Sequence, residues 1–161
     1  MTEVNYIPEG RNTVTPFIVV REAAKAIDFY VKAFGAQEVF RMAGPDGKIL
    51  YAHIKIGDSS ICISDESPQC GDVKSPQTLG AVSSSLYVYV QDTDAAHKRA
   101  IDAGCENKMP PTDMFWGDRF SSVKDPFGHQ WSLATHVEDV SFEEMKKRQD
   151  AFCTQMAGAR S

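Results

Sequence analysis

A strand, a helix and a glycine stop follow one another in residues 13–36, TVTPFIVVREAAKAIDFYVKAFGA. Residues 13–20 alternate as a strand does, and Pro16 indicates that this strand lies at an edge or is only beginning there. Apolar residues then recur at helical spacing from Arg21 to Phe34, and Gly35 stands where a C′ glycine ends a helix. Three more strands are predicted, at residues 37–42, 49–56 and 60–64. Residues 13–66 therefore form one βαβββ unit.

The same order of elements returns in residues 84–137. Residues 85–90 alternate as a strand, and a helix follows over residues 94–103, capped by Asp92-Thr93 and ended by Gly104. The strands expected after this helix are residues 106–109, 118–123 and 129–136. The chain is thus predicted to have an α+β fold made of tandem βαβββ units, each with a curved mixed sheet.

Three segments fall outside the repeat. Residues 1–12 form an N-terminal arm, and residues 67–83, rich in Pro, Gly, Ser and Gln, are predicted to be a linker or mobile loop. Residues 138–161 are expected to form a C-terminal helix and tail, with Ser141 as N-cap. The apolar stripe of this helix consists of Phe142, Met145, Phe152 and Met156. We expect the stripe to pack on the protein itself or on a dimer partner.

Composition and charge exclude several classes of function. The 161 residues carry a formal net charge of -5, which argues against a nucleic-acid partner. No stretch resembles a signal peptide or a membrane span, so we expect a cytoplasmic protein without a membrane partner. The cysteines have no C-x-x-C spacing and are expected to be reduced; they are Cys62, Cys70, Cys105 and Cys153.

Alternation along the strands separates two faces. One is uniformly apolar, as a sheet must be where it packs on helices, and collects Ile18, Val20, Ile54, Ile56, Ile61, Ile63, Leu86, Val88, Val90, Trp131 and Leu133. The other mixes aromatic rings with single polar groups and collects Thr15, Phe17, Tyr51, His53, Lys55, Cys62, Ser85, Tyr87, Tyr89, Gln130, Ser132 and His136. A dry core would not hold so many polar groups, so this mixed face is predicted to line a concave small-molecule site.

Several motifs carry a family resemblance through their order and spacing. They are AIDFY at residues 26–30, YAHIKIG at 51–57, ICISD at 61–65, FWGDRF at 115–120 and VKDPFGHQW at 123–131. Together they resemble the vicinal oxygen chelate superfamily (glyoxalase I, bleomycin-resistance proteins, extradiol dioxygenases), and within it the PhnB-like branch. The resemblance covers about residues 13–155. It implies a glyoxalase/bleomycin-resistance fold in which each sheet curls into a cup, with a ligand or metal held between paired units.

The resemblance also implies four metal-ligand positions, one on each of two strands per unit. Anchored on the strand–helix order and the Asp-Pro-x-Gly turn, these positions are Thr15, His53, Ser85 and Ser132. A catalytic divalent metal usually needs three or four His, Asp or Glu donors, and only His53 is of this kind. We therefore expect no cofactor and no catalytic metal.

Three functions remain open. The first is a metal-free binding protein of the resistance type, which holds an aromatic or planar small molecule between the units. Its expected contacts are Thr15, Phe17, Tyr51, His53, Lys55, Ser85, Tyr87, Tyr89, Phe115, Trp116, Arg119 and Ser132, with Arg119 or Lys55 for an anionic group. Trp131 falls instead on the helix-facing side, which predicts a structural role.

The second function is a metal-dependent lyase, isomerase or dioxygenase of the glyoxalase type, with His53 as one ligand. The third is a metal-free enzyme in which His53 is the catalytic residue, acting as general acid or base. A structural histidine bonded to Ser85 or Ser132 is the alternative for His53. In each case a homodimer is expected, with residues 68–83 and the C-terminal helix near its interface.

Overall fold

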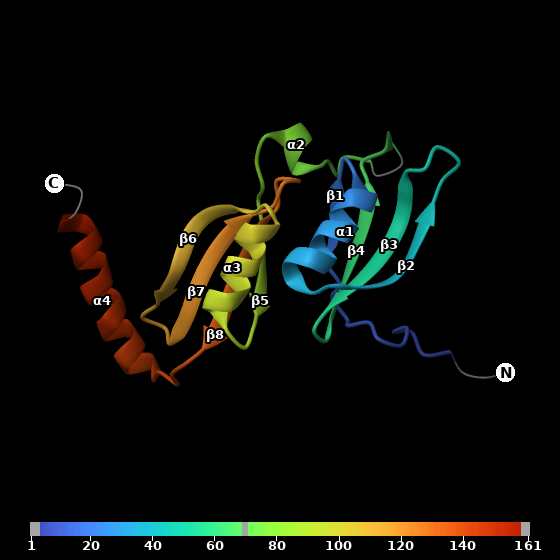
Figure 1. The fold of residues 1–161 in the computed structure, drawn as a ribbon. Helices are drawn as coiled ribbons and strands as arrows, with labels where there is room; N and C mark the ends of the chain where they lie inside the picture. Colours follow the sequence, from blue (N-terminus) through green and yellow to red (C-terminus); the bar gives the residue numbers. More distant parts are fainter. Residues whose placement is uncertain (1–3, 69–70, 159–161) are drawn as a thin grey trace.

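The computed structural model describes residues 4–68 and 71–158, which form two similar units (Figure 1). The first unit contains β1 (Phe17–Val20), α1 (Ala23–Phe34), β2 (Gln37–Ala43), β3 (Ile49–Ile56) and β4 (Ser59–Asp65). The second contains β5 (Ser85–Tyr89), α3 (Thr93–Ala103), β6 (Glu106–Asp113), β7 (Asp118–Lys124) and β8 (Gln130–His136). The short helix α2 (Pro76–Leu79) lies between the units, and α4 (Phe142–Gly158) follows the second. The predicted tandem of βαβββ units is confirmed.

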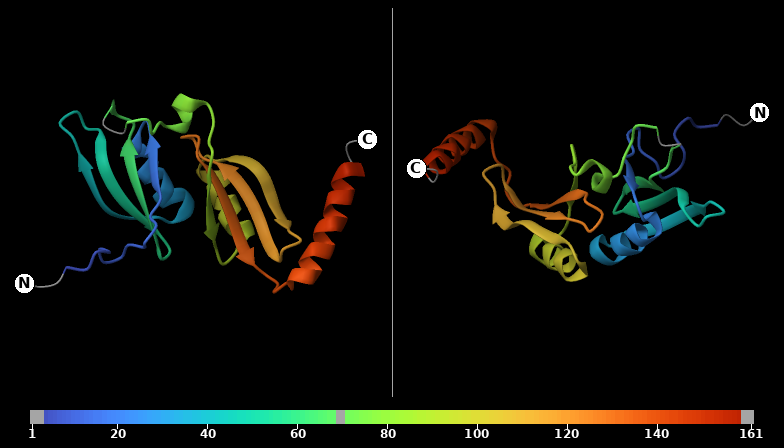
Figure 2. Two further views of the ribbon diagram at one scale, coloured as in Figure 1. Left: turned by 180° about the vertical axis from the view of Figure 1, so that it is seen from behind. Right: turned by 90° about the horizontal axis from the view of Figure 1, so that it is seen from above.

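Each unit forms a four-stranded mixed sheet with its helix on one face. The strand orders are β1-β4-β3-β2 and β5-β8-β7-β6, with a parallel pair at β1 and β4 and another at β5 and β8. The helices α1 and α3 lie side by side on one side of the molecule (Figures 1 and 2). Both sheets consequently turn their helix-free faces to the opposite side, where ligand-binding residues were predicted.

The helix-facing side is a dry core that joins the two units. Trp131 is completely buried, and its ring stacks on that of Phe34 from α1 at a centroid distance of 4.3 Å. The buried carboxylate of Asp125 accepts hydrogen bonds from the Tyr30 hydroxyl at 2.8 Å and from the Trp131 indole N–H at 2.9 Å. The polar atoms of these two large rings are thus satisfied across the contact between units. The structural role predicted for Trp131 is confirmed.

Three elements differ from the sequence-based expectation. The first strand begins at Phe17 rather than at residue 13, after Pro16, whose carbonyl still accepts from the Cys62 N–H at 2.9 Å. The strand β6 runs on to Asp113 through Pro110 and Pro111, which an edge strand tolerates because it leaves one row of N–H groups unused.

The third difference is α2, a helix of four residues within the linker that composition had suggested to be a loop. Ser75 caps it, because its side chain accepts from the Thr78 N–H, and Pro76 follows at the first helical position. Gly80 ends it with a φ of 71°, in the left-handed region that favours glycine. The start and stop signals were present in the sequence, but they enclose too few residues to show a helical period.

The helix α4 stands away from the two units, and none of its described residues is buried (Figure 1). Phe142 at its start is 81% exposed, Met145 is half-buried, and the ring of Phe152 lies 5.6 Å from that of Phe115. The predicted packing of the apolar stripe on the protein itself is therefore only partial. Packing on a dimer partner stays a prediction.

The connection from β8 to α4 is braced by the turn between β6 and β7. The carbonyl of Gly117 accepts from the N–H groups of Val137 and Glu138 at 2.9 and 3.0 Å. A β-carbon on Gly117 would lie 2.1 Å from the Glu138 carbonyl oxygen, so only glycine permits this close approach.

Among the described helices, none is both long and apolar enough to cross a membrane.

Candidate functional site

The helix-free face of the first sheet carries rings around a polar centre, and we call it the N-terminal face. It is formed by Phe17, Phe40, Tyr51, His53 and Cys62. Phe17 is 48% exposed and stacks on Tyr51 at 6.1 Å, and the ring of Phe40 meets His53 edge-on at 5.8 Å. His53 lies directly opposite Cys62 on the neighbouring strand, so both side chains point to this face.

Arg11, from the segment before β1, closes the centre of the N-terminal face. Its guanidinium donates to the Cys62 sulfur at 2.9 Å and to the Tyr51 oxygen at 2.9 Å. The Tyr51 oxygen is in turn 3.1 Å from the same sulfur. His53 is only 4% exposed, and its Nε2 atom has no hydrogen-bond partner. Burial, with the nearby charges of Arg11 and Lys55, lowers the pKa of His53, so its imidazole is neutral at pH 7.

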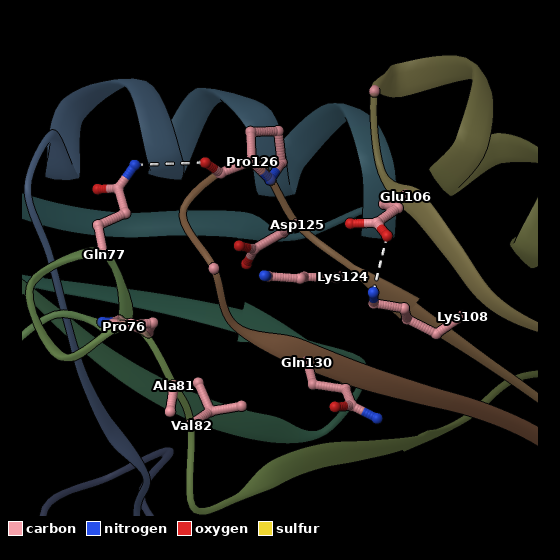
Figure 3. A pocket seen from close by; sticks show the side chains of 13 residues that line it. Pro76, Gln77, Ala81, Val82, Glu106, Lys108, Lys124, Asp125, Pro126 and Gln130 are labelled. Atoms are coloured by element: carbon pink, nitrogen blue, oxygen red, sulfur yellow. Dashed lines mark hydrogen bonds and ion pairs between the residues drawn. The ribbon is translucent and has the colours of Figure 1, made fainter.

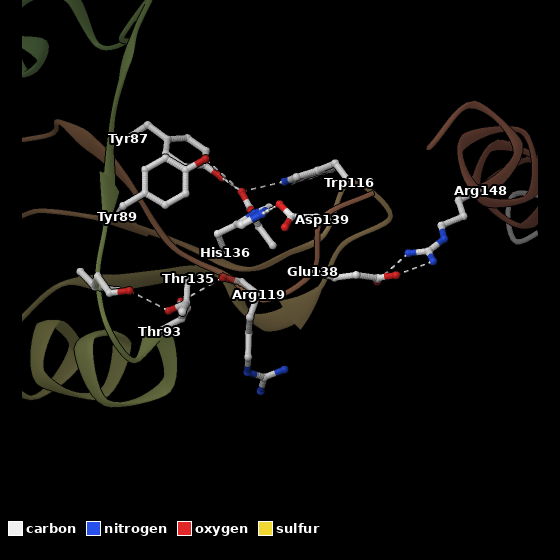
Figure 4. A network of polar contacts seen from close by, with 12 residues as sticks. Tyr87, Tyr89, Thr93, Trp116, Arg119, Thr135, His136, Glu138, Asp139 and Arg148 are labelled. Carbon is white, nitrogen blue, oxygen red and sulfur yellow. Dashed lines mark hydrogen bonds and ion pairs between the residues drawn. The ribbon is translucent and has the colours of Figure 1, made fainter. Parts of the chain in front are cut away.

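The helix-free face of the second sheet has a carboxylate at its centre, and we call it the C-terminal face. Asp118 is buried, and its Oδ2 accepts from the Tyr87 hydroxyl at 3.0 Å, the Tyr89 hydroxyl at 3.2 Å and the Trp116 indole at 3.2 Å (Figure 4). Its Oδ1 is 2.9 Å from Nδ1 of His136. Four side chains thus converge on one carboxylate, two of them from β5, one from β8 and one from the turn between β6 and β7.

These contacts set the charges of the C-terminal face. Burial alone would raise the pKa of Asp118, but the bonds from His136, Tyr87, Tyr89 and Trp116 hold it below its ordinary value. The pKa of His136 is raised, because its two ring nitrogens bond to Asp139 and Asp118. Burial and the bond to Asp118 raise the pKa of Tyr87. The centre is therefore an ionised carboxylate with neutral tyrosines around it.

The strand registers of the two sheets show which positions on the two faces are equivalent. Phe17 stands six residues before the start of α1, and Tyr87 six residues before the start of α3. Phe17 pairs with Cys62 and Tyr87 with Ser132, so Cys62 is the counterpart of Ser132. This corrects the expected correspondence, which gave His53 that position. His53, one strand further along, is the counterpart of Ser122, because β3 aligns with β7 and not with β8.

Several predicted contacts do gather on the two faces. Phe17, Tyr51 and His53 belong to the N-terminal face, and Tyr87, Tyr89 and Trp116 to the C-terminal face. Ser85 and Ser132 also lie there, with their hydroxyls 3.1 Å apart. Within one chain the buried Nε2 atom of His53 bonds to neither serine, contrary to the alternative of a histidine bonded to them.

Others lie at the margin or elsewhere. Arg119 is turned away from the rings of the C-terminal face and pairs with Asp94 of α3 at 2.7 Å and with Asp113 at 3.0 Å (Figure 4). It follows Asp118 directly in β7, and alternation sends the two side chains to opposite faces. Phe115 contacts Trp116 at 5.0 Å and α4, at the rim. Thr15 precedes β1 and donates to the Asn12 carbonyl at 3.3 Å, and Lys55 is half-buried near Gly10.

Sequence reasoning found the polar centres of the two faces only in part. Asp118 shares its face with Phe120 and Ser122 by simple alternation, so strand parity could have found it. His136 was placed on the mixed face but not among the ligand contacts. Nothing in the sequence indicated that Arg11, from a segment without helix or strand, would reach a sulfur 51 residues away.

Three hollows lie beside the two sheets. One of about 890 Å³ lies at the end of the first sheet, beside Phe17 and Leu50. Another of about 450 Å³ lies where the units meet and is lined by Tyr87 and Tyr89 together with residues of the segment before β1. A third, of about 520 Å³, lies between α2 and the second sheet and is lined by main chain and polar groups such as Lys108, which pairs with Glu106 (Figure 3). Only the first two touch the aromatic residues.

The donor set at the family's ligand positions does not fit a divalent metal. With Cys62 in the place of His53, the positions that the resemblance implies are Thr15, Cys62, Ser85 and Ser132. The cationic Arg11 already binds the Cys62 sulfur, and the two serine hydroxyls bond to each other. Across residues 4–68 and 71–158, no three His, Cys, Asp or Glu side chains are grouped as a metal site. A hydroxyl set beside a guanidinium offers a divalent ion little stabilisation.

Comparison with known proteins agrees with this architecture. The profile of the Glyoxalase/Bleomycin resistance protein/Dioxygenase superfamily matches residues 12–133. The uncharacterized protein Rv0887c of Mycobacterium tuberculosis is 42% identical over 135 residues, which span 83% of this chain and 79% of that protein. The chain therefore belongs to the Glyoxalase/Bleomycin resistance protein/Dioxygenase superfamily.

Solved structures add similarity of fold. TioX from Micromonospora sp. ML1 is 24% identical, with a TM-score of 0.61 over 78% of this chain and 99% of TioX. The PhnB protein from Bacillus cereus is 17% identical, with a TM-score of 0.59 over 77% of this chain and 99% of that protein.

Proposed function

We propose that this protein binds an aromatic or planar small molecule on its two aromatic faces, without a catalytic metal. The observation that carries the proposal is the exposure of rings on the helix-free sides of both sheets: Phe17, Tyr87 and Tyr89 are 48%, 46% and 65% exposed. Exposed rings gathered around a polar centre are typical of a ligand pocket rather than of a plain solvent-facing surface.

We further propose that two copies of the chain form a homodimer in which the N-terminal face of one copy meets the C-terminal face of the other. The arrangement of the units supports this pairing. Because α1 and α3 pack together, both faces open to the same side and do not close on each other within one chain (Figure 2). A second copy can cover both faces at once in an isologous contact. Each resulting cup would combine Arg11 and Tyr51 of one copy with the centre around Asp118 of the other.

Tryptophan fluorescence offers a direct test of binding. The chain has two tryptophans, of which Trp131 is buried between the units and Trp116 lies on the C-terminal face. A screen of planar aromatic compounds should yield at least one that raises the melting temperature and quenches the emission of Trp116. The Trp116→Phe variant, which keeps Trp131, should lose the quenching but keep the thermal shift. A screen without any stabilising compound contradicts the proposal.

The pairing between copies can be tested by complementation. Tyr51→Ala removes a ring from the N-terminal face, and Tyr87→Ala removes one from the C-terminal face. Each variant alone should bind the ligand weakly. When the two are mixed, refolded together and allowed to dimerise, one cup of each mixed dimer has both rings, so part of the binding should return. If the ligand site lies within one chain, mixing restores nothing, and a monomeric mass by light scattering also refutes the pairing.

The absence of a metal requirement is tested in the same assay. Nickel, zinc or manganese should leave the melting temperature within about 1 °C and the ligand affinity unchanged, because the donor set does not fit a divalent ion. Stoichiometric metal in protein purified without chelators contradicts this part of the proposal.

One observation favours a second function, acid–base catalysis by His53. Its imidazole is buried and neutral, and Nε2 has no partner, so it could accept a proton from a bound ligand. Mass spectrometry of any ligand found in the screen, after incubation with the protein, would reveal turnover. Turnover that is lost in His53→Gln while binding persists supports catalysis, and an unchanged ligand leaves the protein as a binding protein.

A further inference from the structure

Cys62 stands apart from the other described cysteines in its surroundings. Cys105 is buried in the core, where burial and the charge of Asp125 raise the pKa of its thiol to about 12. Cys153 is exposed on α4. Cys70 lies outside the described residues. Cys62 alone of the three lies on a face that is open to ligands.

Two polar groups, those of Arg11 and Tyr51, converge on the Cys62 sulfur. Arg11 donates through Nη1 at 2.9 Å, and through Nη2 it donates to the Tyr51 oxygen. Because that oxygen accepts from Arg11, the Tyr51 O–H is free to donate to the sulfur at 3.1 Å. The pKa of Tyr51 is raised, in the first place by its bond to Cys62. The sulfur is thus held in a fixed position as an acceptor, with its proton not needed for either bond.

His53 supplies a second and independent sign of a ligand. It faces Cys62 across β3 and β4, is more than nine-tenths buried, and leaves Nε2 without a partner. A buried polar atom without a hydrogen bond is costly, and a bound molecule with a polar atom beside Cys62 would satisfy it. Arg11 retains further N–H groups beyond the two it uses, and Lys55 adds a second positive charge nearby. The surroundings of the sulfur therefore attract an anion.

We propose that Cys62 is a nucleophilic thiol that forms a thioether with a small electrophile bearing a carboxylate, such as an α,β-unsaturated acid. The sulfur bonds to the β-carbon, the electron pair of the C=C bond moves to the α-carbon, and this carbon takes up the proton that the thiol released to solvent. Atoms and charge balance without an oxidant. The identity of the natural electrophile rests on the proposed function, because the electrophile would occupy the same cup. The reactivity of the thiol itself is independent of the proposed function.

Access to the sulfur is through Arg11. Cys62 is 5% exposed, but the guanidinium that covers it belongs to a segment without helix or strand and is itself only partly buried. A carboxylate that draws Arg11 toward itself uncovers the sulfur. A neutral reagent does not draw Arg11 away from the sulfur, so the charge of the reagent should determine the reaction rate at Cys62.

Iodoacetate and iodoacetamide test this directly, because they alkylate thiols by the same displacement of iodide and differ in charge. Both are applied to the unmodified full chain, and the alkylation rate of each cysteine is measured by peptide mass spectrometry. Cys153 is the control within the same molecule. The ratio of the iodoacetate rate to the iodoacetamide rate should be about tenfold higher at Cys62 than at Cys153, from local electrostatic attraction. Equal ratios, or a Cys62 that stays unmodified while Cys153 is fully alkylated, overturn the proposal.

Two variants test whether Arg11 causes the preference of Cys62 for iodoacetate. Arg11→Gln should lower the ratio at Cys62 most of the way toward that of Cys153, with Lys55 retaining a smaller part of the attraction. Arg41→Gln removes one positive charge from β2 of the same sheet, where Arg41 pairs with Glu38 and Asp28, and should leave the ratio unchanged. In both variants Cys105 should stay unmodified, which shows that the core is intact. An Arg11→Gln variant that keeps the full ratio contradicts the assignment.

The outcome is distinguishable from that of the proposed function. If Cys62 is unreactive or unselective while aromatic compounds still stabilise the protein, only the proposal of a nucleophilic Cys62 is contradicted. If Cys62 reacts selectively but the protein binds no aromatic compound, the proposed function is contradicted and the proposal of a nucleophilic Cys62 stands.

Discussion

The two sheets of this protein share a backbone plan but carry opposite charges at the centres of their open faces. On the N-terminal face the cationic Arg11 binds a sulfur and a tyrosine. On the C-terminal face the carboxylate of Asp118 binds two tyrosines, a tryptophan and a histidine. The rings recur at equivalent places, as Phe17 and Tyr87 do, while the polar groups do not.

The difference has a physical reason. The helix-facing positions must be apolar to form the core between α1, α3 and the sheets, whereas the open faces can carry polar and charged groups of either sign. The two faces also differ in how far their buried polar groups are hydrogen-bonded: Asp118 has four donors, but the buried Nε2 of His53 has no partner. A planar ligand between such faces would be stacked by rings and oriented by charge.

The largest expected effect is from Asp118→Ala. It removes the acceptor shared by Tyr87, Tyr89, Trp116 and His136, so the free energy of unfolding should fall by about 2–3 kcal/mol, the order found for bonds to a charged group. Urea denaturation followed by circular dichroism measures the change. Asp139→Ala is the matched control, because this exposed carboxylate also bonds His136; its loss should be much smaller than that of Asp118→Ala, because solvent screens an exposed ion pair. Equal losses in the two variants would show that convergence on Asp118 stabilises nothing.

His53→Leu is the counterpart on the N-terminal face and should have a smaller effect of opposite direction. Leucine fills similar space and removes a buried nitrogen that lacks a hydrogen bond, so the protein should be unchanged or more stable by up to about 1 kcal/mol. The same denaturation assay measures it. A loss of more than about 1 kcal/mol would mean that the imidazole is bonded in solution, and the contrast between the two faces would then fail.

Much of the fold could be predicted because its signals are local. Alternation separated the two faces of each strand, and Gly35 and Gly104 marked the ends of the two long helices of the repeat. Trp131 was assigned to the core by parity alone. The edge strand β6 was predicted too short, since Pro110 and Pro111 are acceptable only at an edge, and edge position is a property of the assembled sheet.

The polar centres could be predicted only in part. Parity placed Cys62 and His136 on the mixed face, but a period of two cannot say which strands are neighbours. The pairing of β1 with β4 gave Cys62, rather than His53, the position equivalent to Ser132. Arg11 is tied to the site by contacts across 40 and 51 residues, and no local pattern encodes such distances.

The histidines of the two faces give the last and smallest test, because their pKa values are shifted in opposite directions. Burial lowers that of His53, and bonds to Asp139 and Asp118 raise that of His136. NMR titration of the ring protons should place the two on opposite sides of about 6.5, the ordinary value.

For stability, the charged His136 contributes fully below about pH 6.5, and its contribution is lost as the pH rises through the raised pKa. The stability difference between the wild type and His136→Gln should therefore be larger at pH 6 than at pH 9, with a magnitude below that of Asp118→Ala because His136 is exposed. Glu138→Gln is the control: Glu138 pairs with Arg148 and its pKa is lowered, so its contribution stays constant over this range. A His136 effect that stays constant or grows toward pH 9 would mean that His136 is not charged by its two carboxylates, and the C-terminal face would then carry an unbalanced buried anion.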